Sequence, residues 1–445
     1  MTRARRYHVW AAIVAVAVSA LLASDPAHAV VQGISGHTTF NFSARTDYLA
    51  NPDGTYLLFW GFADDDGFNP IQGQTQYPGP TLILRQGDMV TIHLKNYLPE
   101  PVSMVFPGLE GPTTPVHDGG ILRSLTHEVP PDAGVTTGTY TFTASQPGTY
   151  TYQSGTNMDR QLGMGLYGAI IVRPTMTDAS CPPPTLLGAP PCRRAYETDD
   201  SIYHREYLLI LSEFDSRQHV AVEYGLTYDP TDPIADYWFI NGRSAMDTLT
   251  DSYAPWIPSQ PYDAIVSLHP AEKILIRMIN LGRDPHPFHT HGNHMNLIAR
   301  DGRLLESTPG SGADLSELHF TLNIAPGQTA DSIFTWRAEN LGWDIFGHTS
   351  VTDPMQPGEW EPDHGTPFPV QMPYFTSLAY DEFYSGSPFL GQTGPLPADL
   401  TRDNLTGFMS FMWHSHKEGE MVNQNDFPGG MMTILFVEAP WVFIP

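Results

Sequence analysis

Short runs of alternating apolar and polar residues dominate the 445-residue chain, and glycine, proline and asparagine bound most of them. Such alternation has the period of a β-strand with one exposed face, whereas the longer repeat of an amphipathic helix is hard to find. The clearest runs are Tyr56–Gly61, Met89–Leu94, Gly138–Phe142, Lys273–Met278 and Ser332–Trp336. With 39 glycines, 41 prolines and only 16% charged residues, the pattern predicts an all-β protein built from β-sandwiches.

The two halves of the chain look like copies of one another. The run Gln86–Asn96 resembles Pro270–Asn280, and each is followed by a segment that ends in glycine, Ser103–Gly108 and Pro287–Gly292. We therefore expect two β-sandwich domains, at residues 30–174 and 201–445. A proline-rich linker at 175–200 joins them, and an irregular stretch at about 347–407 is interpreted as an insertion in the second domain.

The first 29 residues have the composition of a secretory signal peptide. A basic start precedes an apolar run, and Ala27-His28-Ala29 has the small-residue form of a cleavage site. We expect export to the periplasm or the extracellular space by ordinary secretion, with a twin-arginine signal as the alternative. No later apolar run is long enough to span a membrane. In an exported chain the two cysteines, Cys181 and Cys192, are expected to form a disulfide.

The charge of the chain restricts its partners. The formal net charge is -26 at pH 7. Such a surface repels nucleic acid and anionic membranes, and it attracts cations, including metal ions. We therefore expect no nucleic-acid partner and no membrane span, and a small-molecule or metal-ion substrate if the protein is active.

Two His-x-His pairs are the strongest chemical signal in the sequence. One pair is His289 and His291, and the other is His414 and His416. Residues i and i+2 of a strand point to the same face, so each pair presents two imidazoles on one side. Four convergent imidazoles suit copper, zinc or nickel better than calcium or magnesium. The alternative is a set of relic histidines that are hydrogen-bonded in a sandwich core.

Other histidines could serve as additional ligands. His286 and His294 flank the first pair and are reserve candidates. His348 and His364 lie in the expected insertion and could supply a replacement ligand, but we interpret them as exposed loop residues.

At these residues the chain resembles the multicopper oxidases, in particular their two-domain, laccase-like branch. The most specific match is His-Pro-Phe-His-Thr-His-Gly at 286–292. Tyr-Pro-Gly-Pro at 77–80, the strand at 165–172 and Phe-Ile-Asn-Gly at 239–242 extend the resemblance over most of the chain. It implies two cupredoxin-like Greek-key β-sandwich domains and copper as the cofactor. It also implies reduction of dioxygen at a trinuclear cluster and a homotrimer with that cluster at the subunit interface.

The resemblance assigns a role to each matched histidine. His286 matches a type 1 copper ligand, and the two His-x-His pairs match ligands of the trinuclear cluster. The type 1 cysteine of the family is replaced by Ser415, and its second type 1 histidine by Glu420. A blue-copper site needs a thiolate, so the resemblance implies that this site is missing.

The first half also departs from the family pattern. The positions that should carry two further His-x-His pairs hold Val105 and Pro107, then Gln153 and Gly155. Half of the eight cluster ligands are therefore replaced. What remains is a histidine site within the second domain, for which His291 and His414 form the best core because they match ligands of the same copper.

Three functions follow from these residues. The first is an exported copper protein with a residual histidine site, able to act as an oxidoreductase without a type 1 centre. The second is a metal-free structural or interaction protein on a cupredoxin scaffold. The third is a copper or zinc carrier without turnover.

Overall fold

The computed structural model describes residues 31–176, 192–337, 339, 343–356, 358–367, 371–373, 401–403, 409–439 and 442–444. Within them the chain is mostly β, as the alternating pattern predicted. The expected signal peptide, Cys181 and much of the expected insertion lie outside the described residues, so the signal and the Cys181–Cys192 disulfide stay predictions. None of the helices in the described part is long and apolar enough to cross a membrane.

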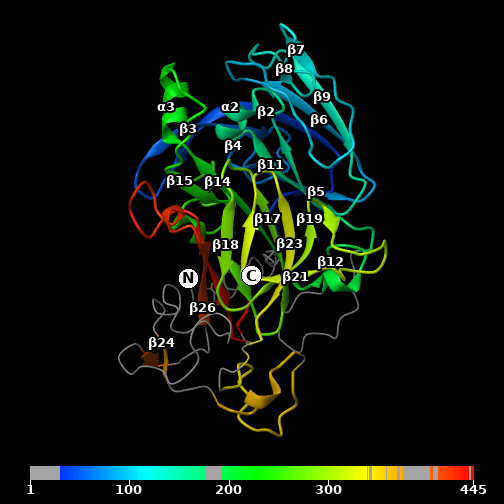
Figure 1. Ribbon diagram of the computed structural model, residues 1–445, viewed down its shortest axis with the longest axis vertical. Helices are drawn as coiled ribbons and strands as arrows, with labels where there is room; N and C mark the ends of the chain where they lie inside the picture. Colours follow the sequence, from blue (N-terminus) through cyan, green and yellow to red (C-terminus); the bar gives the residue numbers. More distant parts are fainter. Residues whose placement is uncertain are drawn as a thin grey trace, which may run out of the picture.

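Two sheets form the first half of the chain. The larger has the strand order β4-β3-β2-β6-β9, and the smaller has the order β1-β5-β11-β10. Their strands are β1 (Ile34–Ser35), β2 (Thr39–Ala50), β3 (Tyr56–Asp64), β4 (Thr75–Gln76), β5 (Gly79–Arg85), β6 (Met89–Asn96), β9 (Thr137–Thr143), β10 (Gly148–Gln153) and β11 (Tyr167–Arg173). Most of them lie in the upper part of Figure 1, in blue to cyan-green.

Two further sheets form the second half. The larger has the order β15-β14-β17-β23-β19-β20, with β21 beside β19, and the other has the order β16-β27-β26-β18-β22. Their strands are β14 (Arg205–Phe214), β15 (Tyr237–Ile240), β16 (Val266–Leu268), β17 (Lys273–Asn280), β18 (His286–Thr290), β19 (Met295–Arg300), β20 (Arg303–Leu304), β21 (Glu317–His319), β22 (Thr321–Ile324), β23 (Thr329–Thr335), β26 (Met409–Ser415) and β27 (Met432–Val437).

The remaining elements are short. Three two-stranded ribbons pair β7 with β8, β12 with β13 and β24 with β25. Their bounds, with those of the helices, are β7 (Val116–Asp118), β8 (Ile121–Ser124), β12 (Arg193–Arg194), β13 (Ile202–Tyr203), β24 (Gln371–Pro373), β25 (Thr401–Asp403), α2 (Met158–Gly163), α3 (Ser216–Tyr224) and the 3-10 helices Asp199–Ser201, Asp247–Leu249, Glu361–Asp363 and Glu418–Glu420. Helix α3 begins where the Asp215 carboxylate accepts a hydrogen bond from the backbone N–H of Arg217, and it ends at Gly225, whose φ is 66°.

The same pairing pattern occurs in both halves. In the first half β6 lies between a parallel neighbour, β2, and an antiparallel neighbour, β9. In the second half β17 lies in the same way between β14 and β23. The opposing sheets repeat as well, because β11 pairs with β5 and β10 as β27 pairs with β16 and β26. These pairings give the resemblance between Gln86–Asn96 and Pro270–Asn280 a structural counterpart.

Burial explains why some strands alternate and others do not. Strand β6 alternates, with Val90, Ile92 and Leu94 buried in the core of the first half. Strand β17 is buried from Ile274 onward on both faces. One face packs into the core of the second half, while Ile279 joins an apolar cluster that contains residues of both halves. The two halves are therefore held together by a shared apolar core.

A buried polar network also crosses between the halves. The Arg277 guanidinium donates to Glu206 through Nε at 2.6 Å and to Asp331 through Nη1 at 3.1 Å. Thr149, on β10 of the first half, donates from Oγ1 to Asp331 at 2.6 Å and accepts from Arg277 at 2.9 Å. All these side chains are buried, so each charge depends on its partners for solvation.

Replacing Arg277 should therefore destabilise the protein strongly. Arg277→Met leaves two buried carboxylates short of their cation, which we expect to lower the free energy of unfolding by roughly 3–5 kcal/mol. Chemical denaturation at neutral pH measures the change. The control is Arg337→Met, because Arg337 is exposed, Glu339 is partly exposed, and the paired atoms lie 3.9 Å apart. Equal effects of the two substitutions would contradict this account of the network.

Candidate metal centre

The register of two neighbouring strands brings the histidines together. Strands β18 and β26 are antiparallel, and His289 lies directly opposite His414. His291 follows the end of β18, where Trp413 Nε1 donates to the His291 carbonyl at 2.9 Å. The two-residue period of the strand puts the His291 side chain on the same face as that of His289. Three imidazoles from distant parts of the sequence therefore meet on one side of the sheet.

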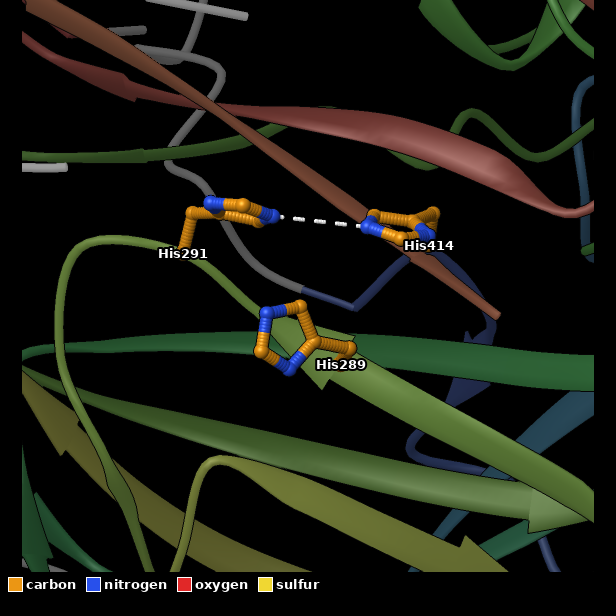
Figure 2. Close-up of side chains that lie close together, drawn as sticks. All are labelled: His289, His291 and His414. Carbon is orange, nitrogen blue, oxygen red and sulfur yellow. Dashed lines mark hydrogen bonds between the residues drawn. The ribbon is translucent and has the colours of Figure 1, made fainter. Parts of the chain in front are cut away.

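The three rings are arranged as a compact group (Figure 2). His291 and His414 lie almost end to end, with Nε2 atoms 3.4 Å apart, and His289 lies beside the gap between them. One ligand nitrogen from each ring lies within 4.8 Å of the other two. Metal–nitrogen bonds of about 2.0 Å separate two ligands of a tetrahedral ion by roughly 3.3 Å. The His291–His414 spacing is thus close to the spacing that a shared ion requires.

Hydrogen bonds orient two of the rings. His414 Nδ1 lies 2.7 Å from the Ser415 carbonyl, which can only accept, so Nδ1 carries a proton. In the neutral ring Nε2 then has a free lone pair, directed at His291. His289 Nδ1 lies 2.8 Å from Thr321 Oγ1, which leaves Nε2 as the other ligand atom. Such outer contacts are characteristic of metal-binding histidines because they fix the ring and its tautomer.

Burial keeps the three rings uncharged. Removal from water, followed by repulsion from neighbouring histidines, lowers the pKa of His289 to about 4. The same causes lower the pKa of His291 to about 3, and burial lowers that of His414 to about 4. Neutral imidazoles are the metal-binding form, so at neutral pH no proton competes with a metal ion here.

Two predicted ligands lie beside this triad and not within it. His416 is 45% exposed, and its ring centroid lies 5.0 Å from that of His289 and 5.5 Å from that of His414. His294 packs edge-on against Phe320, with ring centroids 5.5 Å apart. Neither belongs to the group of converging ligand atoms. The structure thus brings together three of the six predicted metal ligands.

His286 is held by carboxylates and is unsuited to the reserve role. It is fully buried, with Nδ1 2.8 Å from Glu420 Oε2 and Nε2 3.0 Å from Glu213 Oε2. Ser415 Oγ donates to the same Glu420 oxygen at 2.6 Å. Since carboxylates only accept, both nitrogens of His286 carry protons and the ring is an imidazolium without a free lone pair. His286, which the resemblance matches to a type 1 ligand, is thus engaged in ion pairs with Glu213 and Glu420.

Charge balance explains this arrangement. Burial alone would lower the pKa of His286, but hydrogen bonds to Glu213 and Glu420 outweigh it and raise the pKa to about 9. Burial likewise opposes ionisation of Glu420, yet its hydrogen bond from His286 lowers its pKa. Each charge stabilises the other, with Ser415 as an additional donor.

The corresponding positions of the first half carry no imidazole. Val105 and Gln153 exchange two backbone hydrogen bonds, of 2.8 and 3.0 Å, and so face one another as His289 and His414 do. The first half therefore repeats the backbone pairing of the histidine site, but Val105 and Gln153 offer no imidazole nitrogen to a metal ion.

The sequence analysis missed a second cluster of potential ligands. Asp344, His348, Glu359 and His364 each direct one nitrogen or oxygen into a group whose atoms lie within 4.8 Å of one another. The interpretation of His348 and His364 as exposed loop residues was wrong, because their side chains are only 14% and 9% exposed. Two histidines alternating with two carboxylates within 21 residues was the available signal.

The His286 ion pair should give stability a distinctive pH dependence. Its pKa is raised above the unfolded value of 6.5, so its contribution is complete below that pH and is lost as pH rises through about 9. The free energy of unfolding should therefore fall over this interval in the wild type by an additional amount on the order of a few kcal/mol relative to His286→Gln. Chemical denaturation across the interval tests this. His319→Gln, which removes a partly exposed histidine–glutamate pair, should behave like the wild type. Parallel curves for wild type and His286→Gln would contradict the assignment.

Comparison with known sequences gives a consistent picture. The family model described as "Multicopper oxidase" matches residues 69–177. Laccase-1 of Cryptococcus neoformans var. grubii is 25% identical over 69% of this chain and 45% of its own length. Laccase-15 of Oryza sativa subsp. japonica is 26% identical over 67% of this chain and 43% of its own length. The chain thus spans about half the length of these relatives.

Solved structures with the same fold include two oxidases. Multicopper oxidase mgLAC has a TM-score of 0.50 at 19% identity, and the blue copper oxidase from Nitrosomonas europaea has a TM-score of 0.51 at 18% identity. Each alignment covers 89% of this chain and 85% of the other. At these identities the likeness concerns the fold. The family model over residues 69–177, the laccase relatives and the shared fold thus agree that this chain is similar to multicopper oxidases and laccases.

Proposed function

We propose that this chain is an exported, cupredoxin-like copper protein that binds copper through His289, His291 and His414 of one chain. The observation that carries the proposal is the convergence of three buried, neutral imidazoles whose ligand atoms lie within 4.8 Å of one another. Copper follows from the donor set and from the family, since imidazole suits copper and copper heads the divalent affinity series. The proposal includes two β-sandwich domains, with the metal site in the second.

The second part of the proposal is that no type 1 copper supplies electrons to this site. Ser415 offers a hydroxyl in place of the thiolate, and His286 is engaged at both nitrogens by Glu213 and Glu420. Bound copper would supply one-electron chemistry by alternating between two oxidation states. Without a relay, electrons would have to reach the triad directly from a small reductant or a reducing metal ion.

The surroundings of the triad are compatible with direct access. His416 is the exposed histidine of the group, and its ring lies next to those of His289 and His414. His414 is fixed by the Ser415 carbonyl and His289 by Thr321, so these two rings are oriented before any metal binds.

A homotrimer remains part of the proposal through the resemblance alone. In the family a neighbouring subunit completes the cluster with histidines of its first domain. Here the matching positions hold Val105, Pro107, Gln153 and Gly155, none of which offers a nitrogen ligand of that kind. A trimer of this chain would therefore be held by packing and would not complete a trinuclear site.

Removing two of the three rings should abolish copper uptake at this site. Each ligand supplies one bond, and the His289 ring left in His291→Ala/His414→Ala cannot hold an ion alone. Copper bound per chain after dialysis, measured by mass spectrometry of the metal, should fall by at least one ion relative to the wild type. The control is His117→Ala, an exposed histidine of β7, which should bind as the wild type does. Undiminished copper in the double variant would refute the triad as the site.

The copper-loaded protein should not show the intense colour of a thiolate–copper centre. Ser415 cannot form the required copper–sulfur bond. Visible absorption of the loaded wild type should therefore contain only weak bands. A strong blue band would overturn our interpretation of Ser415 and His286. Dioxygen uptake with a phenol or ferrous ion then separates an oxidoreductase from a copper carrier, which would bind the metal and consume none.

A further inference from the structure

A second group of potential ligands lies in the segment that follows the last strand of the larger second-half sheet. Asp344, His348, Glu359 and His364 belong to the gold to orange segment at the bottom of Figure 1. The segment starts beside the second-half core, in which Trp343, Ile345 and Phe346 are buried. Its ends are tied together, because the Asp344 N–H donates to the Thr366 carbonyl at 2.7 Å.

The four side chains place two nitrogens and two oxygens around one point. Asp344 Oδ2 lies 2.9 Å from His348 Nδ1 and 3.5 Å from His364 Nδ1. Glu359 Oε1 lies 3.3 Å from His348 Nδ1 and 2.7 Å from His364 Nδ1. Bonds of about 2.0 Å to a tetrahedral ion separate its ligands by roughly 3.3 Å, which lies within the range of these distances.

Outer hydrogen bonds hold each carboxylate in place. Asp344 Oδ1 accepts from the Phe346 N–H at 2.8 Å, and Oδ2, which accepts from the Gly365 N–H at 2.9 Å, is directed at the histidines. Glu359 Oε2 accepts from the Gln356 N–H at 2.7 Å, which leaves Oε1 for the same group. Both carboxylates are buried, with side-chain exposures of 0% and 2%. A buried carboxylate requires a compensating positive charge.

The contact between His364 and Glu359 requires either a proton or a metal ion between the two side chains. His364 Nε2 lies 2.9 Å from the Asp353 carbonyl and must donate, so Nε2 is protonated. In the neutral ring Nδ1 would then be a lone pair 2.7 Å from Glu359 Oε1, and two acceptors would face each other. Either a proton lies between the two atoms, carried by the His364 ring or by the Glu359 carboxyl, or a metal ion binds both of them.

We propose that Asp344, His348, Glu359 and His364 form a closed, four-ligand site for a divalent transition-metal ion, for which zinc is the probe. Two imidazoles and two carboxylates are ordinary zinc ligands, and their two negative charges balance the ion. Four protein ligands leave no open position, which is typical of structural and not catalytic zinc sites. The ion would fasten the segment 344–366 to the core through the neighbouring Trp343, Ile345 and Phe346.

This site differs from the histidine triad in its ligands and in its place in the chain. The triad consists of three imidazoles on β18, β26 and the turn after β18, whereas this site includes two anionic oxygens and lies within a single segment. Neither group contains a residue of the other, so each can be removed alone. The inference therefore does not depend on the proposed copper function.

Zinc binding in a triad-deficient background tests the inference. His291→Ala/His414→Ala is dialysed against zinc chloride, separated from free metal and analysed for zinc. We expect a single zinc ion per chain, and its loss when His348→Gln and Glu359→Gln are added, because two of four bonds disappear. The matched control adds His319→Gln and Glu317→Gln, which removes a histidine–glutamate pair on β21, and should keep the ion.

Each outcome decides the inference. A triad-deficient chain that retains no zinc, or one that retains the same amount after His348→Gln/Glu359→Gln, would overturn it and leave the cluster as imidazolium–carboxylate pairs. If a variant fails to fold, the wild type decides the question. Excess zinc should raise its melting temperature more than the same concentration of magnesium does. Zinc should also protect the segment 344–366 from proteolysis, and magnesium should not. Unchanged melting and unchanged proteolysis of that segment would contradict the site.

Discussion

The cross-strand pairing of β18 with β26 is the constraint on which the candidate site depends. Side chains directly opposite on an antiparallel pair have Cβ atoms about 4.5–5.5 Å apart, the spacing over which two imidazoles can share one ion. The pairing places His289 opposite His414, and the strand period adds His291. A shift of one residue would turn these rings to the other face. The register is fixed by the core residues Phe288 and Trp413, which are fully buried beside the histidines.

The buried histidines near this strand pair differ in protonation state. The triad is buried and lies beside other imidazoles, which lowers the pKa values of the three rings and keeps them neutral. His286 lies between Glu213 and Glu420 and stays protonated, although β18 carries it only three residues from His289. Glu420 thus has a structural role, because its buried carboxylate balances the charge of the buried His286 ring.

The sequence predicted the β fold and the histidine convergence for identifiable reasons. Alternation along β6 gave the strand, and the His-x-His spacing gave two side chains per face without any knowledge of the fold. The contact of His286 with Glu213 could not be predicted in this way, because Glu213 is 73 residues away on β14 and no local pattern links the two residues. The Asp344–His364 cluster was missed for a related reason. Its ligands lie in irregular backbone, where periodicity does not indicate which side chains converge.

The central claim is that one chain holds copper with His289, His291 and His414. Anomalous diffraction at the copper absorption edge, from crystals of the copper-loaded protein, tests it most directly. The account predicts a peak within about 2 Å of one nitrogen of each of these three rings, with no peak between His286 and Ser415. A peak at His286 and Ser415, or copper found only at the Asp344–His364 cluster, would contradict it.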